Sequence, residues 1–304
     1  MNVATEREGF ERALLARRRS PSTVRLYVAM LYPFAVFLAH RGCADLRSVT
    51  RRDVDAYVTE LAGSPLAPAT RSLRLRAVKR LFEHLVETQK LLSSPAEHLR
   101  DRRATSLPGR VLAEAEVDNL LAAPNTSLPR GIRDRALLEL LYATGLRRGE
   151  VVGLDVFDVD LGGGLVRVRG KGGHERLVPL SKEAQKWLGE YLRQVRPRLA
   201  RHGDGERALL LTRSGRRMGP GAVDQALLSH SKAAGLRRVS CHALRRTVGT
   251  ALVRGGADVR TVAELLGHAR VSTTTRYTLL AATDLRREHA RTHPRGNGRL
   301  PSDR

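Results

Sequence analysis

Several residue types and patterns are scarce in this chain, and each shortage excludes a class of protein. Two cysteines, Cys43 and Cys241, occur in 304 residues. They are too few for a disulfide framework and suit a reducing compartment. No apolar run approaches the roughly 20 residues that a membrane-spanning helix needs. Residues 1–11 mix acidic and basic side chains without an apolar core, so no signal peptide is expected. We therefore expect a cytoplasmic protein without a membrane partner.

Acidic residues are also scarce relative to basic ones. The chain has 31 Asp and Glu residues against 54 Lys and Arg, which gives a formal net charge of +23 and a sequence pI near 11.3. Such an excess favours a polyanionic partner, and nucleic acid is the default. A high-GC genome would also enrich arginine, but it does so at the expense of lysine, and that exchange leaves the charge unchanged.

Motifs for nucleotide, metal and cysteine chemistry are missing. The Gly-x-x-x-x-Gly-Lys-Ser/Thr spacing of a phosphate-binding loop is absent, and residues 162–164 form no dinucleotide fingerprint. His289 and His293 lie four residues apart in a polar tail with no third ligand, which argues against a metal site. Cys241 adjoins His242, so their side chains point apart and do not form a protease pair. We expect neither a cofactor nor a metal ion.

The first hundred residues carry helix signals only. Ser20 and Pro21 are typical of a helix N-cap and first position. The apolar residues that follow have helical spacing; they are Val24, Tyr27, Val28, Leu31, Phe34 and Leu38. A second helix is predicted from Thr50, with Asp53 in its first turn, and a third from residue 69 to residue 87.

Four cations flank the apolar stripe of the third helix: Arg71, Arg74, Lys79 and Arg80. A solvated polar face explains most such charge runs, yet in so basic a chain we favour contacts with DNA phosphates. Proline, glycine and charged residues between 92 and 110 predict a linker. We place the boundary near residue 106, which gives an all-helical domain over 1–105 and a second domain over 106–304.

The second domain mixes helices with one predicted hairpin. Helices are expected over 113–122 and 130–142, the latter ending at Thr144-Gly145, and again over 181–196 and 222–234. Arg147 follows on a turn, where Glu150 could orient its guanidinium group. Strands 165–169 and 175–179 flank a glycine-rich tip that carries Lys171. The pattern indicates a mainly α fold with a small antiparallel β-sheet, of the α+β class.

A polar series runs from Ser240 to Leu279. His242 and Arg245 are three residues apart, so on a helix they share a face and can address one anionic group. Gly267 looks like the residue just past a helix end, from which His268 would emerge. Tyr277 is expected on a following short helix. Cations facing a tyrosine suggest phosphate chemistry.

These residues resemble the motifs of the tyrosine recombinase, or phage integrase, family, and the layout is most similar to its Xer-like site-specific recombinases. Five boxes match in the family's order: Thr144-Gly145-Leu146-Arg147-Arg148-Gly149-Glu150, Gly170-Lys171-Gly172-Gly173, His242-Ala243-Leu244-Arg245, Leu266-Gly267-His268 and Thr275-Arg276-Tyr277. One departure is Arg246, which stands where the family more often has a second histidine.

The resemblance implies a SAM-like helical core-binding domain that clamps DNA, followed by a catalytic domain. It implies site-specific cutting and rejoining of duplex DNA through a 3′-phosphotyrosyl intermediate, without ATP or metal. Tyr277 would be the nucleophile, and Arg147 and Arg245 would bracket the phosphate. His242 would assist proton removal or contact the phosphate. His268 would donate a hydrogen bond to it, and Lys171 would protonate the leaving 5′ oxygen.

The same resemblance implies a tetramer that recombines two duplexes through a Holliday junction, with a second recombinase or an accessory protein as a further partner. Residues 279–304 would form the C-terminal segment that family members dock on a neighbouring protomer. No arm-binding domain precedes Ser20, which favours dimer resolution or simple mobile-element integration. Three alternatives stay open: a catalytically inactive DNA-binding regulator of the same fold, a type IB topoisomerase-like relaxing enzyme, and a structural basic protein.

Overall fold

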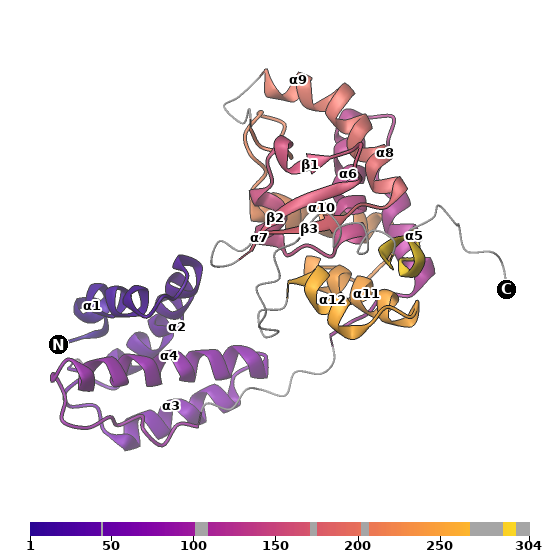
Figure 1. The fold of residues 1–304 in the computed structure, drawn as a ribbon. Coiled ribbons are helices and arrows are strands. Elements are labelled where there is room, and N and C mark those ends of the chain that lie inside the picture. Colours follow the sequence, from indigo (N-terminus) through magenta and orange to yellow (C-terminus); the bar gives the residue numbers. More distant parts are fainter. Residues whose placement is uncertain (44, 101–108, 171–174, 202–206, 268–287, 296–304) are drawn as a thin grey trace. The chain divides into compact units, whose positions relative to one another are not determined.

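The computed structural model describes residues 1–43, 45–100, 109–170, 175–201, 207–267 and 288–295. Packing divides the chain into two compact units, Met1–Pro108 and Gly109–Arg304 (Figure 1). The predicted domain boundary near residue 106 falls in residues 101–108, outside the described ranges, and stays a prediction.

The described part of unit 1 is helical: α1 (Val3–Ala16), α2 (Pro21–His40), α3 (Arg51–Gly63) and α4 (Pro68–Glu87). The predicted caps are confirmed. Ser20 accepts a hydrogen bond from the Thr23 backbone N–H at 3.3 Å. Thr50 and Asp53 form a reciprocal capping box at the start of α3. These side chains satisfy backbone donors that a helix N-terminus leaves without partners.

Helix α1 escaped prediction. It begins with a capping box between Asn2 and Thr5, and it buries Phe10 and Leu14. Only two large apolar side chains of this helix are fully buried, so its apolar stripe is too short to give a clear helical pattern. The N-cap residue Asn2 is also followed by a charge-rich stretch, which obscures the pattern further. Packing against α2 and α4, which the sequence pattern does not reveal, gives this helix its place.

The core of unit 1 concentrates the chain's few aromatic residues. The Phe34 ring lies 5.0 Å from Tyr57 and 6.1 Å from Phe82, and Phe37 lies 5.1 Å from Tyr57 between ring centroids. These tilted and edge-on geometries suit the charge distribution of aromatic rings. The rings come from α2, α3 and α4, so a single cluster joins three helices.

Among the described helices, α2 is long and apolar enough to cross a membrane when length and composition alone are considered. The expectation that no stretch approaches such a span is therefore wrong for Pro21–His40. Five of its side chains are buried against the rest of unit 1, among them Val24, Leu31 and Phe34. Core helices satisfy the same criterion, so the length and composition of α2 are weak evidence for a membrane span.

The described part of unit 2 combines helices with an antiparallel sheet, which confirms the predicted fold class. Its elements are α5 (Glu114–Ala122), α6 (Pro129–Thr144), α7 (Arg148–Gly153), η1 (Val156–Asp158), β1 (Val159–Asp160), β2 (Leu165–Arg169), β3 (Glu175–Pro179), α8 (Lys182–Glu190), η2 (Tyr191–Val195), α9 (Arg196–Ala200), α10 (Pro220–Ala233), α11 (Cys241–Arg254) and α12 (Val259–Leu266).

Helix α6 lies at the centre of this unit. Every residue from Ala136 to Thr144 is buried, and the helix packs against α5, α8, η2 and α11 (Figure 1). A helix that is buried all round is held by its neighbours on every side. Because α6 ends at Thr144 with Gly145 as its C-cap, Arg147 follows a helix that is packed on several sides.

The three strands are ordered β1-β2-β3, with Val166 opposite Val178 and Val168 opposite Arg176. Side chains alternate between the two faces of a strand. One face therefore presents Val166, Val168, Arg176 and Val178, all of which are buried. An arginine thus occupies a position that the strand pattern assigns to the core side. The tip that carries Lys171 lies outside the described residues.

The predicted helix over 181–196 is interrupted. Ser181 caps α8 by accepting a hydrogen bond from the Ala184 N–H at 3.2 Å. From Tyr191 to Val195 the chain forms a π-helical turn before α9 resumes. The buried Tyr191 hydroxyl accepts a hydrogen bond from the Leu211 N–H at 3.1 Å. Periodicity alone cannot register the extra residue of a π turn.

His289 and His293 are buried, which corrects the expectation that they lie in a polar tail. Their rings stack with centroids 4.6 Å apart, and their Nε2 atoms lie 2.9 Å from the Ala143 carbonyl and 3.2 Å from the Tyr142 carbonyl. Arg295 completes the contact by binding Asp118 and Glu139 at 2.6 and 2.8 Å. Burial lowers the pKa of both histidines, for His293 to about 3, with His289 and Arg295 disfavouring its protonation further.

This arrangement predicts acid sensitivity of unit 2. A histidine buried in its neutral form contributes stability that is complete above the unfolded pKa near 6.5 and is lost as pH falls below it, by about 1.4 kcal/mol per pH unit for each group. Urea unfolding followed through Trp187, the single tryptophan, should show a declining midpoint below about pH 6.5. His293→Gln should have a shallower pH dependence; parallel curves for variant and wild type would contradict this assignment.

Candidate active site

Arg147 is placed by the junction between α6 and α7. Gly145 ends α6 in the left-handed conformation, with φ 60°. A Cβ atom at Gly145 would lie 2.6 Å from Cδ2 of Leu266, so glycine is needed for α12 to approach this closely. Two residues later Arg147 is the N-cap of α7, and its side chain is 44% exposed. The guanidinium group is therefore held at the surface of unit 2, beside the end of α12.

Glu150 is buried beside Arg147 and accepts four hydrogen bonds. Oε1 accepts from Arg147 Nη1 at 2.9 Å and Arg176 Nη1 at 3.0 Å. Oε2 accepts from the Arg147 backbone N–H at 2.9 Å and Arg176 Nη2 at 3.0 Å. Burial alone would raise the pKa of this carboxyl, but these hydrogen bonds outweigh it and lower the pKa, so Glu150 is ionised. It orients Arg147, as the sequence suggested.

Arg176, on β3, was not predicted as a site residue. Besides its two hydrogen bonds to Glu150, its Nε donates to the Leu265 carbonyl at 3.0 Å. Only 8% of the residue is exposed. Strand alternation from Val178 could have placed it on the buried face, but an Arg-rich chain gives no signal that one particular arginine has a buried carboxylate partner.

Three successive carbonyl groups at the end of α12 accept hydrogen bonds from three arginines. Leu265 O accepts from Arg176, Leu266 O from Arg245, and Gly267 O from Arg147 at 2.6 Å. The carbonyls at a helix C-terminus have no partners within the helix and carry partial negative charge. Gly267 ends the helix in the left-handed conformation, with φ 66°, as its sequence position predicted. This helix end therefore brings three arginines of the described residues together.

Among the predicted site cations that the structure describes, Arg245 is the most buried. It lies on α11, is 5% exposed, and donates to the Gly145 carbonyl at 2.8 Å as well as to Leu266 O. Burial lowers its pKa to about 10, and the nearby positive charge of Arg147 adds to this effect. At neutral pH it remains a cation. Its two carbonyl partners come from α6 and α12, so it joins both helix ends.

His242 lies in the first turn of α11, as predicted, and is exposed. Ser240 caps this helix by accepting a hydrogen bond from the Ala243 N–H at 3.2 Å. Desolvation lowers the pKa of His242, and the positive charges of Arg246, Arg245 and Arg147 lower it further. The imidazole is therefore neutral near pH 7 and can accept a proton. Arg246, the residue that departs from the family pattern, acts on His242 through its charge.

Lys171, His268 and Tyr277 lie outside the described residues. Their predicted roles as general acid, hydrogen-bond donor and nucleophile stay predictions. His268 directly follows Gly267, whose carbonyl binds Arg147. Within the described ranges, no three His, Cys, Asp or Glu side chains come close enough together to hold a metal ion.

The four cations predicted to contact DNA lie on α4 in unit 1, and each has a neighbouring group within that unit. Arg71 donates to the Ala62 carbonyl at 2.8 Å, and Lys79 donates to the Leu99 carbonyl at 2.6 Å. Arg80 pairs with Glu83 at 2.6 Å. Arg74 lies near the buried Tyr57; burial raises the pKa of that phenol, and the arginine's charge offsets part of the rise. Phosphate contacts by these side chains stay a prediction.

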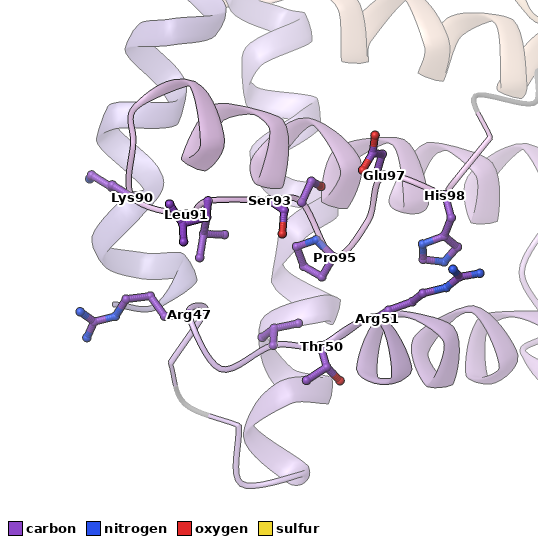
Figure 2. Close-up of a pocket in the computed structure, with 12 residues that line it drawn as sticks. Arg47, Thr50, Arg51, Lys90, Leu91, Ser93, Pro95, Glu97 and His98 are labelled. Atoms are coloured by element: carbon purple, nitrogen blue, oxygen red, sulfur yellow. The ribbon is translucent and has the colours of Figure 1, made fainter.

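Unit 1 also contains a hollow of about 810 Å³. Figure 2 shows the segment from Lys90 to His98 along one side and Arg47 to Arg51 along the other. Its basic side chains have acidic partners: Arg47 binds Asp45 at 2.7 Å, Lys90 binds Glu6 at 2.7 Å, and His98 binds Asp55 at 2.7 Å. This neutralised hollow differs from the cation cluster of unit 2.

Comparisons with known proteins identify the family of this chain. A family model described as the phage integrase family matches residues 110–283, and one described as its N-terminal SAM-like domain matches residues 8–89. The chain is 38% identical over 279 residues to a protein named tyrosine recombinase XerC from Myxococcus xanthus, covering 91% of this chain and 93% of that one.

Solved structures share the fold. A XerH site-specific recombinase bound to its difH substrate aligns with a TM-score of 0.67 and 21% identity, covering 89% of this chain and 81% of that one. A lambda integrase tetramer bound to a Holliday junction aligns with a TM-score of 0.65 and 17% identity, covering 91% of this chain and 80% of that one.

The packing at the end of α12 predicts that alanine substitution will lower the unfolding free energy by different amounts at two glycines. Gly267 and Gly235 both have left-handed φ, 66° and 68°, so each substitution should cost about 1–2 kcal/mol of unfolding free energy. A Cβ atom at Gly267 would lie 3.0 Å from the Arg176 guanidinium, whereas at Gly235 it would meet nothing within 4 Å. Urea unfolding should therefore show a larger loss for Gly267→Ala. Equal losses would mean that Arg176 yields without strain.

Proposed function

We propose, from the premise that the chain belongs to the phage integrase family, that its arginine cluster binds the scissile phosphate of duplex DNA. The chain is a Xer-like tyrosine recombinase, and its activity is site-specific DNA recombination. The observation that carries the assignment of the phosphate site is the convergence of Arg147 and Arg245 on neighbouring carbonyls at the end of α12.

Both arginines keep donors for a phosphate. A guanidinium group has five N–H donors, and the contacts described above use two in each side chain. Three of these four contacts are with neutral carbonyl groups, and the fourth is with Glu150, whose charge Arg147 shares with Arg176, so the pair of phosphate-binding arginines keeps net positive charge. Arginine binds phosphate oxygens through charge-assisted hydrogen bonds. Arg147 and Arg245 would bracket the non-bridging oxygens and stabilise the charge that develops in the transition state.

The covalent step needs a nucleophile and two proton transfers. The Tyr277 oxygen would form a bond to phosphorus while the bond to the 5′ oxygen breaks, leaving a 3′-phosphotyrosyl ester. The phenolic proton would pass to the neutral His242, and Lys171 would give a proton to the departing 5′ oxygen. His268 would donate a hydrogen bond to the phosphate. Because the ester retains the bond energy, rejoining by the reverse step requires no ATP.

The assembly follows from the chemistry of strand exchange. Four protomers on two duplex sites would cut and rejoin strands in pairs through a Holliday junction, and a second recombinase or an accessory protein would be a further partner. Resolution of chromosome or plasmid dimers is the proposed role, with integration or excision of a mobile element as the other use of the same reaction. A cytoplasmic location follows from a DNA substrate and is part of this proposal.

A covalent-adduct assay tests the nucleophile. Wild type, Tyr277→Phe and the control Tyr32→Phe, which changes an exposed tyrosine of unit 1, would be incubated with total DNA of the source organism in EDTA without ATP. We expect an SDS-resistant, protease-sensitive adduct with wild type and with the control, and none with Tyr277→Phe. Sequencing the trapped ends would locate the site. DNA binding without any adduct would favour the non-catalytic regulator. Adducts at sites of unrelated sequence would favour the topoisomerase-like enzyme.

The lowered pKa of His242 predicts how cleavage depends on pH. If His242 accepts the phenolic proton, cleavage requires its neutral form, so the rate should hold as pH falls to about 6.5 and decline only below that value. Arg246→Gln removes a nearby positive charge, raises the pKa of His242 and should move the decline to higher pH. Rates of adduct formation would be measured for wild type, Arg246→Gln and His242→Gln. An unchanged acid limb in His242→Gln would exclude this role.

A further inference from the structure

Arg176 joins three parts of the candidate site through one buried side chain. It comes from β3, binds Glu150 of α7 through both terminal nitrogens, and binds the Leu265 carbonyl of α12 through Nε. Its guanidinium also fills the space beside Gly267, where a Cβ atom would lie 3.0 Å away. All three guanidinium nitrogens of Arg176 make these contacts, two of them with a carboxylate, so we do not assign phosphate binding to it.

We propose that Arg176 is a positioning residue for DNA cleavage, which fixes Glu150 and the end of α12 so that Arg147 and Arg245 address one phosphate together. The inference rests on the proposed function of those two arginines. Arg147 has two side-chain contacts, with Glu150 Oε1 and the Gly267 carbonyl. Arg176 binds that same carboxylate and the carbonyl two residues earlier, so it supports both ends of the Arg147 clamp.

The charge on Arg176 also matters to the site. Glu150 by itself would neutralise Arg147, the cation that it orients. With Arg176 sharing the carboxylate, the group of Arg147, Arg176, Arg245 and Glu150 keeps two uncompensated positive charges. Arg176 thereby lets a carboxylate orient a phosphate-binding arginine while the site stays electropositive.

A second buried arginine offers a matched control. Arg133 is also 8% exposed, also binds one carboxylate through two nitrogens, Asp134 at 2.9 and 2.7 Å, and also binds a backbone carbonyl, that of Leu211 at 3.2 Å. It lies near the start of α6, whereas the site lies beyond the end of that helix, roughly 18 Å away along its axis. Its loss disturbs a similar buried ion pair without touching the site.

The test measures single-turnover cleavage of a nicked duplex that carries the site mapped from the wild-type adduct. At saturating DNA, Arg176→Met should cleave roughly 100-fold more slowly, because a misplaced catalytic group costs about this factor. DNA affinity should stay within a few-fold of wild type. Arg133→Met should keep its cleavage rate. Equal losses of rate in both variants would show that Arg176 serves the fold alone and would overturn the proposal.

Two further variants separate positioning from charge balance. Arg176→Lys keeps the charge but cannot reproduce the two-point contact with Glu150 and the carbonyl bond, so only partial recovery over Arg176→Met is expected. The double variant Glu150→Gln, Arg176→Met removes the buried pair as a whole and leaves no unpaired charge, which favours folding. It should remain slow. Recovery of the wild-type rate in this double variant would overturn the proposal.

Coupling with Arg147 gives a readout that a purely structural role would not produce. If Arg176 acts partly through Arg147, Arg176→Met should slow cleavage by a smaller factor in the Arg147→Ala background than in wild type. Independent, multiplicative losses would contradict positioning. If wild type itself forms no adduct, the proposed function fails and this inference falls with it. If wild type cleaves and Arg176→Met cleaves at the same rate, only the positioning role fails.

Discussion

The C-terminal end of α12 is the anchor on which the candidate site depends. Its last carbonyls have no partners within the helix, and they meet Arg176, Arg245 and Arg147 in turn. Gly267 can end the helix there because glycine adopts the left-handed conformation without a steric penalty. Arginines from three distant parts of the sequence therefore converge on one helix end, which the glycine at position 145 allows to approach α6 closely.

Holding cations close together is unfavourable unless something offsets their repulsion. Unit 2 offsets this repulsion in two ways. Arg133 and Arg295 are neutralised by buried carboxylates, those of Asp134 and Glu139 among them. In the arginine cluster, one carboxylate and several neutral carbonyls hold three guanidinium groups. The first arrangement stabilises a fold and leaves little charge for a ligand. The second leaves positive charge that a phosphate can neutralise. The partners of an arginine, carboxylate or carbonyl, therefore distinguish an arginine that stabilises the fold from one that can bind a ligand.

Local signals predicted most of the scaffold. Ser20, Thr50 and Ser181 cap helices, and Gly145 and Gly267 end them, because caps depend on residues only a few positions apart. The features that escaped prediction depend on distant partners. The π turn at 191–195 accompanies a bond between Tyr191 and Leu211, and Arg176 acquires its importance from a glutamate 26 residues earlier in the chain. The burial of His289 and His293 likewise depends on carbonyls at the end of α6.

The same distinction applies to the cations of α4, where charge alone predicted contact with DNA. Arg80 pairs with Glu83 across partly exposed side chains, and an exposed pair within one helix contributes little to stability, so it can exchange its partner for a phosphate at small cost. Lys79 differs, because it donates to the backbone carbonyls of Glu97 and Leu99 and so ties α4 to the segment that follows it. Moving Lys79 onto DNA would release that segment. Arg80 is therefore better suited to phosphate contact than Lys79, although the sequence presents them as equivalent neighbours.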